Sequence, residues 1–230
     1  MPQRILAIGA HPDDLEFWCG ALLITETRRG HAVVCLVLSR GEAASHGSPP
    51  VREAEARAAA AVMGAEVVLA DLGGDCHLVP AAAVALAREI RRFHPQVVVA
   101  PLPVENQHPD HVVVGRLARD ASRLARYAGL AELKDLPAHA ISALYFYPAT
   151  PNVPARPDIV VDVTPVVGQW EQAMRCHASQ LQTKRYVELQ LTRARLLGLE
   201  VGTEYAQGVY TDDPLHLAAL TDVTRSSRNF

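Results

Sequence analysis

Four ionisable side chains crowd the end of the first apolar run, where AHPDDLE follows RILAIG and contains His11, Asp13, Asp14 and Glu16. One acid at this point would be explained as a helix cap, because carboxylates accept backbone N–H groups there. Three acids and an imidazole exceed what a cap needs. Imidazole and carboxylate groups are also the ligands that hydrolytic zinc sites use. The cluster therefore predicts that a cation is bound here.

The spacing within this cluster separates two roles. His11 and Asp14 are three residues apart, so they share one face if Pro12 opens a helical turn, while Asp13 points elsewhere. We therefore expect His11 and Asp14 to be metal ligands and Asp13 to be a base beside the metal-bound water. Glu16 is better explained as an acid of the first turn that interacts with the helix dipole.

A second His-Pro-Asp sequence occurs in QHPDH, at residues 107–111, after the apolar run PQVVVAP. It supplies two candidates for a third ligand, His108 and His111. Either imidazole could reach the first cluster, and their spacing does not decide between them.

The elements that must position these residues follow from the apolar pattern. Strands are predicted at 4–10, 31–39, 65–71, 95–101, 142–148 and 158–164. Helices are predicted from residues 16, 51, 80 and 110, with one further helix over 165–199; the tail from residue 203 has no clear period. This alternation predicts an α/β fold, a Rossmann-like, mostly parallel sheet with helices on both faces. We expect a single domain over 1–230 with a C-terminal helical extension. In the strand order 3-2-1-4-5, the two clusters face each other at the switch point.

Several classes of function are disfavoured. The first strand-to-helix turn reads GAHPDD instead of G-x-G-x-x-G, and its acids would repel a phosphate, which argues against a nucleotide cofactor. A net charge of −3 does not favour nucleic acid, and no long apolar span indicates a membrane partner. The four cysteines form no C-x-x-C pair, so we expect them to be reduced. The apolar stretch in MPQRILAIGA is too short for a secretory signal, so we expect the protein to be cytoplasmic.

The paired motifs AHPDD-x-E and HPDH resemble those of the LmbE-like (PIG-L) superfamily of metal-dependent N-deacetylases, in particular the bacillithiol-biosynthesis type. The segment SRGEAASHGSPPVREAEARAAAAVMG is also similar to that family, as are HASQ at 177–180 and the EYAQGVY region. The sequence departs from the family at Trp18, Cys19 and LGGDCH, which bears on the substrate more than on the chemistry.

By position, the resemblance implies that His11, Asp14 and His111 ligate Zn²⁺, with Fe²⁺ as the other metal that such a site accepts. It implies that Asp13 is the general base. The expected reaction is removal of the acetyl group from an N-acetylglucosamine-type sugar conjugate, such as the malate-linked sugar, by a homo-oligomer such as a hexamer.

The resemblance assigns His108 as the electrophile that faces the developing oxyanion, acting as an imidazolium, and Asp110 as its orienting partner. Arg52 is either a substrate-binding residue that holds an acidic aglycone or a solvated helix residue. His177 is expected to pack between helices. Two alternatives stay open: a metal-dependent hydrolase of another amide or a phosphoester, and a non-catalytic ligand-binding module.

Overall fold

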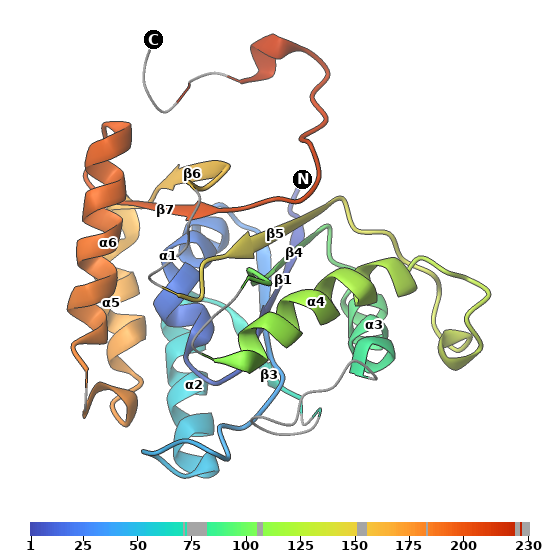
Figure 1. Cartoon of the computed structure of the whole chain (residues 1–230), viewed down its shortest axis with the longest axis horizontal. Coiled ribbons are helices and arrows are strands. Elements are labelled where there is room, and N and C mark those ends of the chain that lie inside the picture. The colour runs from blue at the N-terminus through green and yellow to red at the C-terminus, as the bar shows by residue number, and fades with distance from the viewer. Residues whose placement is uncertain are drawn as a thin grey trace.

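A five-stranded parallel sheet lies at the centre of the computed structural model (Figure 1). The structure describes residues 1–70, 72, 82–104, 108–150, 156–182, 184–223 and 226. The strands are β1 (Arg4–Gly9), β2 (Ala32–Val37), β3 (Glu66–Leu69), β4 (Val97–Pro101), β5 (Ala143–Tyr147), β6 (Ile159–Asp162) and β7 (Ala206–Val209). The α-helices are α1 (Asp14–Arg28), α2 (Pro49–Met63), α3 (Ala82–Phe93), α4 (Pro109–Leu124), α5 (Val167–Arg175) and α6 (Tyr186–Val201).

The order β3-β2-β1-β4-β5 confirms the expected topology, with β1 and β4 adjacent. Side chains of β1 alternate between two cores, as a strand covered on both faces requires. Ile5 and Ala7 belong to one core, and Leu6 and Ile8 to the other. This double burial explains why the strand reads as a continuous apolar run.

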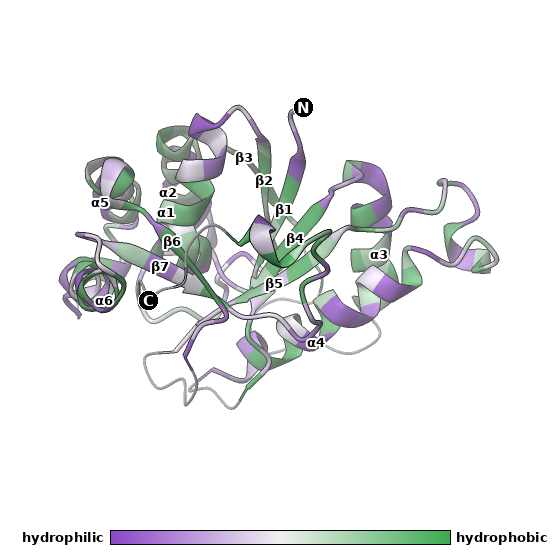
Figure 2. Ribbon diagram, turned by 90° about the horizontal axis from the view of Figure 1, so that it is seen from above, coloured by the Kyte–Doolittle hydropathy of each residue, from purple (hydrophilic) through white to green (hydrophobic). Residues whose placement is uncertain are grey.

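Helices cover both faces of the sheet, as predicted (Figure 2). Helices α3 and α4 pack together on one face. Helix α1 lies on the other face beside α2, and α5 packs against both. Helix α6 packs against α5, α1 and β7, which places the C-terminal part of the chain outside α1. The face that carries α1 is therefore two helical layers deep.

The single helix expected over 165–199 is wrong. Two helices, α5 and α6, are separated by a segment that contains the HASQ sequence. Ser179 explains the break, because its backbone N–H donates to Glu55 Oε1 at 2.8 Å and its hydroxyl donates to Glu55 Oε2 at 2.6 Å. A contact with α2 thus takes the N–H group that a continuous helix would use.

Strand β7 was not predicted, because four residues reading AQGV show no useful period. It pairs antiparallel with β6, and Tyr210 then forms a bridge with Phe146 of β5. Gly208 lies against Pro157, where an added Cβ would come within 2.5 Å of the proline Cβ. A second, two-stranded sheet therefore extends the fold beside β5.

Helix starts differ by one or two residues from those expected, as is usual at helix ends. The predicted start at Pro80 lies outside the described residues, as do Cys76 and the rest of the LGGDCH segment after Leu72. Cys19, Cys35 and Cys176 are free thiols, as expected. Among the described helices, none has both the length and the apolarity that crossing a bilayer requires.

Candidate metal centre

The two His-Pro-Asp sequences meet at the carboxyl ends of β1 and β4, which are neighbours in the sheet. His11 follows β1 and precedes α1, while His108 is the residue before α4. Parallel strands bring their carboxyl ends to one edge, so residues far apart in sequence come together there. The predicted meeting of the two clusters is what the structure shows.

Asp14 is held rigidly at the centre of this group. Its Oδ2 atom accepts the backbone N–H groups of Ala10 and His11, each at 2.9 Å. Its Oδ1 atom lies 3.0 Å from Nε2 of His111. The turn after β1 thus fixes one carboxylate oxygen and leaves the other directed at the second motif.

His11, Asp14 and His111 form a compact set of donors. One ligand atom from each residue lies within 4.8 Å of the others, and all three side chains are buried. His11 Nε2 also lies 3.1 Å from Asp110 Oδ2. A second group, His11, His108 and Asp110, meets the same distance limit, but His108 is more exposed. Two imidazoles and a carboxylate match the ligands of a catalytic zinc site, so the donor set fits a divalent metal.

The electrostatics of this cluster favour positive charge. Burial acts to lower the pKa of His11, but hydrogen bonds with Asp110 and Asp14 outweigh it and raise that pKa to about 11. Burial acts to raise the pKa of Asp14, yet His111 and His11 hold it well below its usual range. A metal ion bound by these imidazoles and carboxylates would replace the protons that they otherwise hold, because metal ligands must be deprotonated.

Asp13 does not belong to either group of donors, and its Oδ2 atom lies 3.2 Å from Arg52 Nη2. Its φ angle is 149°, in the region that favours glycine. Backbone strain of this kind occurs at functional sites that the surrounding structure over-determines. Burial raises the pKa of Asp13 to about 6, with Arg52 acting in the opposite direction. A carboxylate with this pKa can accept a proton near neutral pH.

Arg52 is only 3% exposed, so the solvated-helix alternative is wrong. Its Nη2 atom donates to the backbone oxygen of Pro12 at 2.8 Å in addition to facing Asp13. Its guanidinium packs against Gly41, where an added Cβ would lie 2.3 Å from Nη1. Contact of Arg52 with an aglycone stays a prediction; the geometry shows a residue that positions the strained turn at Asp13.

His108 borders the cluster, with 38% of its side chain exposed. Its Nδ1 atom accepts the backbone N–H of Asp110 at 3.4 Å, so the neutral imidazole carries its proton on Nε2. Burial and the neighbouring His11 lower its pKa. These surroundings favour the neutral imidazole, whose Nε2–H is a hydrogen-bond donor, and the role of His108 as an imidazolium stays a prediction.

A buried pair beside the site was missed in the sequence. His177 is fully buried between helices, as predicted, but its Nε2 atom lies 3.3 Å from Oε2 of Glu16, which is also buried. Burial lowers the pKa of His177, and Glu16 more than offsets this, so the pKa is raised. Glu16 thus does more than interact with the helix dipole. The only sequence feature that pointed to this pair was Glu16, a third acid in a turn where Asp13 and Asp14 already supplied the expected base and ligand.

The chain is an α/β protein with a parallel sheet, and a buried His-Asp-His cluster that could hold a metal lies at the switch point between the adjacent strands β1 and β4. The family profile described as PIG-L, GlcNAc-PI de-N-acetylase, matches residues 6–122, which is more than half of the 230-residue chain. The chain belongs to the PIG-L family.

The similarity to other proteins extends over nearly the whole chain. A conserved protein of Thermus thermophilus has a TM-score of 0.83 and 31% identity, covering 95% of this chain and 98% of its own. The N,N'-diacetylchitobiose deacetylase of Pyrococcus horikoshii has the same fold, with a TM-score of 0.82 and 23% identity over 96% of this chain and 88% of its own. The 4-oxalmesaconate hydratase of Pseudomonas putida is 26% identical over 90% of this chain and 86% of its own length.

Proposed function

We propose that this protein is a divalent-metal-dependent N-deacetylase that acts on N-acetylglucosamine-type sugars. The observation that carries the proposal is the buried cluster of His11, Asp14 and His111 bordered by Asp13 and His108. The family profile, described as GlcNAc-PI de-N-acetylase, supports this choice of reaction. Zn²⁺ is the metal we expect, with Fe²⁺ as the alternative that the same ligands accept.

A metal bound at these ligands would polarise the amide carbonyl and lower the pKa of water. Asp13 would accept the proton of the attacking water and deliver it to the nitrogen of the leaving amine. The amide C–N bond breaks, so acetate and a free amino sugar leave. Arg52, itself held by the backbone oxygen of Pro12, would position Asp13 for this exchange.

His108 would donate a hydrogen bond from Nε2 to the oxyanion that forms during attack. The N–H of Asp110 fixes the imidazole through Nδ1, so the donor is oriented before substrate binds. The Asp110 carboxylate lies closer to His11, at 3.1 Å, than to His108, at 3.8 Å. Asp110 would therefore orient both imidazoles, His108 through its backbone and His11 through its side chain.

The test is release of acetate and a free amine in equal amounts. Zinc-loaded protein is incubated with N-acetylglucosamine, N,N'-diacetylchitobiose and a malate-linked N-acetylglucosaminide, and both products are measured. We expect release from at least one of these sugars and almost none with Asp13→Asn protein. Phosphate release from phosphoesters without acetate release would contradict the proposal.

A second candidate function is hydration of an unsaturated carboxylic acid, because the hydratase from Pseudomonas putida aligns with 90% of this chain. Addition of water across a conjugated double bond removes its ultraviolet absorption. Incubation of the zinc-loaded protein with 4-oxalmesaconate separates the two functions. Loss of absorption without any acetate release from the sugars would favour the hydratase.

A further inference from the structure

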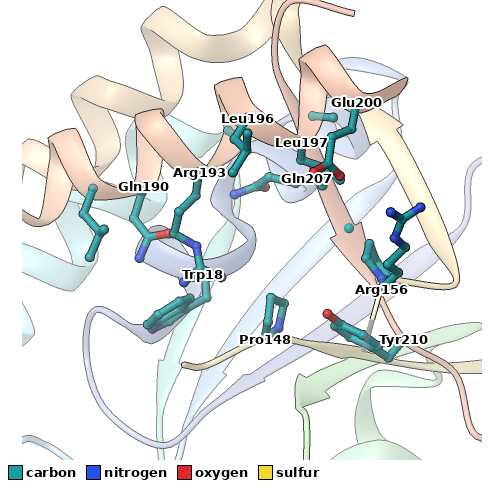
Figure 3. Close-up of a pocket in the computed structure, with 15 residues that line it drawn as sticks. Trp18, Pro148, Arg156, Gln190, Arg193, Leu196, Leu197, Glu200, Gln207 and Tyr210 are labelled. Carbon is teal, nitrogen blue, oxygen red and sulfur yellow. The ribbon is translucent and has the colours of Figure 1, made fainter. Parts of the chain in front are cut away.

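A pocket of about 380 Å³ lies between α6, the chain after β5, and β7 (Figure 3). Trp18, Gln190 and Arg193 lie at one end, and Arg156, Glu200 and Tyr210 at the other. None of the metal-centre residues described above lines it. The proposed deacetylation therefore gives this pocket no role.

Arg193 is the unusual residue of this pocket. Its Nη2 atom donates to the backbone oxygen of Thr150 at 3.4 Å, and its guanidinium lies 5.0 Å from the centroid of the Trp18 ring. Its Nη1 atom is buried and has no hydrogen-bond partner among the described residues. Among the described residues, no carboxylate forms an ion pair with Arg193, and burial lowers the pKa of its guanidinium. By contrast, Arg195 on the same helix pairs with Glu204 at 2.9 Å.

Gln190 supplies a second enclosed donor on the same face of α6. It is 4% exposed, and its Nε2 atom is buried without a hydrogen-bond partner in the described structure. Residues three apart on a helix are neighbours, so the amide and the guanidinium lie side by side, as Figure 3 shows. Two adjacent donors that carry one positive charge match the two acceptor oxygens of a carboxylate.

We propose that this pocket binds a small organic carboxylate, held by Arg193 and Gln190 beside Trp18. An enclosed guanidinium without a counter-charge is costly, and an anionic ligand is what would compensate it. Trp18 covers one face of the guanidinium and limits its hydration, so a carboxylate replaces little bound water. Arg156 and Glu200 at the other end of the pocket are both exposed and opposite in charge, so the positive charge of the site comes from Arg193.

The pocket and the metal centre lie close enough to be linked. Trp18 is one turn of α1 after Asp14, about 6 Å along the helix. Thr150 follows β5 at the edge of the sheet where both His-Pro-Asp sequences lie. The carboxylate therefore has two sources: a free organic acid, or an acidic aglycone of the sugar substrate. The second source rests on the proposed function.

Calorimetric titration with succinate, and with neutral succinamide as its isostere, tests the site. We expect the wild-type protein to bind succinate and not succinamide. Arg193→Met should weaken succinate binding by about 10- to 100-fold, as loss of a charged hydrogen bond does. Arg195→Met is the matched control on the same helix, and it should bind succinate as the wild type does.

Gln190→Glu is a second test, because it places a carboxylate next to Arg193 within the chain. We expect this variant to lose succinate binding and to melt at a higher temperature than the wild type. Succinate binding that survives both Arg193→Met and Gln190→Glu would show that the acid binds elsewhere, such as at the metal, and would overturn the proposal.

The source of the carboxylate is decided by kinetics. kcat/KM is measured for N-acetylglucosaminides with malate or with a neutral methyl group as aglycone. If Arg193→Met lowers the ratio of acidic to neutral substrate by about 10-fold or more, the site holds the aglycone. An unchanged ratio with succinate binding intact in the wild type assigns the pocket to a free acid. If the wild type does not bind succinate and Arg193→Met leaves the ratio unchanged, the proposal is overturned. Deacetylation of the neutral sugar tests only the proposed function.

Discussion

Asp13 and Asp14 are adjacent in sequence, yet their surroundings differ. Asp14 faces His111 and two backbone N–H groups, whereas Asp13 faces Arg52. We predict that Asp13→Asn keeps the metal content of the wild type but loses most of its turnover, because only proton transfer is removed. Asp14→Asn should lose metal, since a ligand is neutralised. Metal analysis and acetate release on both variants check this, and the reverse pattern would mean that the two roles are exchanged.

For His108, a role as hydrogen-bond donor can be separated by experiment from a role as metal ligand. Its neutral Nε2–H can stabilise an oxyanion, and loss of one such donor typically lowers kcat by about 10² to 10³. We predict a decrease of this size for His108→Ala, with bound metal unchanged and a smaller effect on KM. If the variant loses its metal and regains activity in excess zinc, His108 is a ligand.

At the scale of elements, the loop after β2 contacts Arg52, which faces the proposed general base, Asp13. Gly41 has a φ angle of 73° and touches the Arg52 guanidinium, whereas Gly30 has a φ of 85° and nothing within 4 Å of an added Cβ. Both Gly→Ala changes should lower the free energy of unfolding by about 1 to 2 kcal/mol, the cost of a left-handed residue, and Gly41→Ala by more, because its added Cβ also displaces the buried Arg52. Only Gly41→Ala should also lower kcat, because it displaces Arg52 from Asp13. Equal activities would show that Arg52 does not position the base.

The connection between α5 and α6 depends on a buried contact. Ser179 is 6% exposed and binds Glu55 of α2 through both its backbone and its hydroxyl. We predict that Ser179→Ala lowers the free energy of unfolding in urea by about 1 to 3 kcal/mol, because Glu55 loses a buried partner. The control is Glu171→Gln, which breaks the exposed pair with Arg175 and should cost under about 1 kcal/mol. Similar costs for both variants would mean that the Ser179 hydroxyl contributes little.

The sequence predicts what local pattern and sheet topology determine. Apolar runs give the strands, their alternation with helices gives the strand order, and the order brings His11 next to His111. Contacts between elements remote in sequence could not be predicted. The direction of Arg52, the pairing of Glu16 with His177 and the break in the C-terminal helix all depend on how α2 and α5 pack on α1. No periodicity encodes that packing.

At the scale of the whole molecule, metal and stability should be coupled. A ligand that binds only the folded chain stabilises it by about 2.7 kcal/mol when it is present at 100 times its Kd. We predict that zinc raises the melting temperature and that a chelator reverses the effect. Asp13→Asn should keep this response and Asp14→Asn should lose it. A response retained by Asp14→Asn would place the stabilising metal elsewhere.

The pairing of β1 with β4 has a consequence for how the protein refolds. Asp14 and His111 are separated by 97 residues, so a metal that joins them acts as a cross-link across a long loop. A metal that is released on unfolding leaves the unfolded chain unconstrained, so its ligands must be brought together across this loop each time the chain folds. Closing so long a loop costs entropy before the contact is made. Capture of zinc during refolding should therefore coincide with completion of the sheet and not with an earlier step.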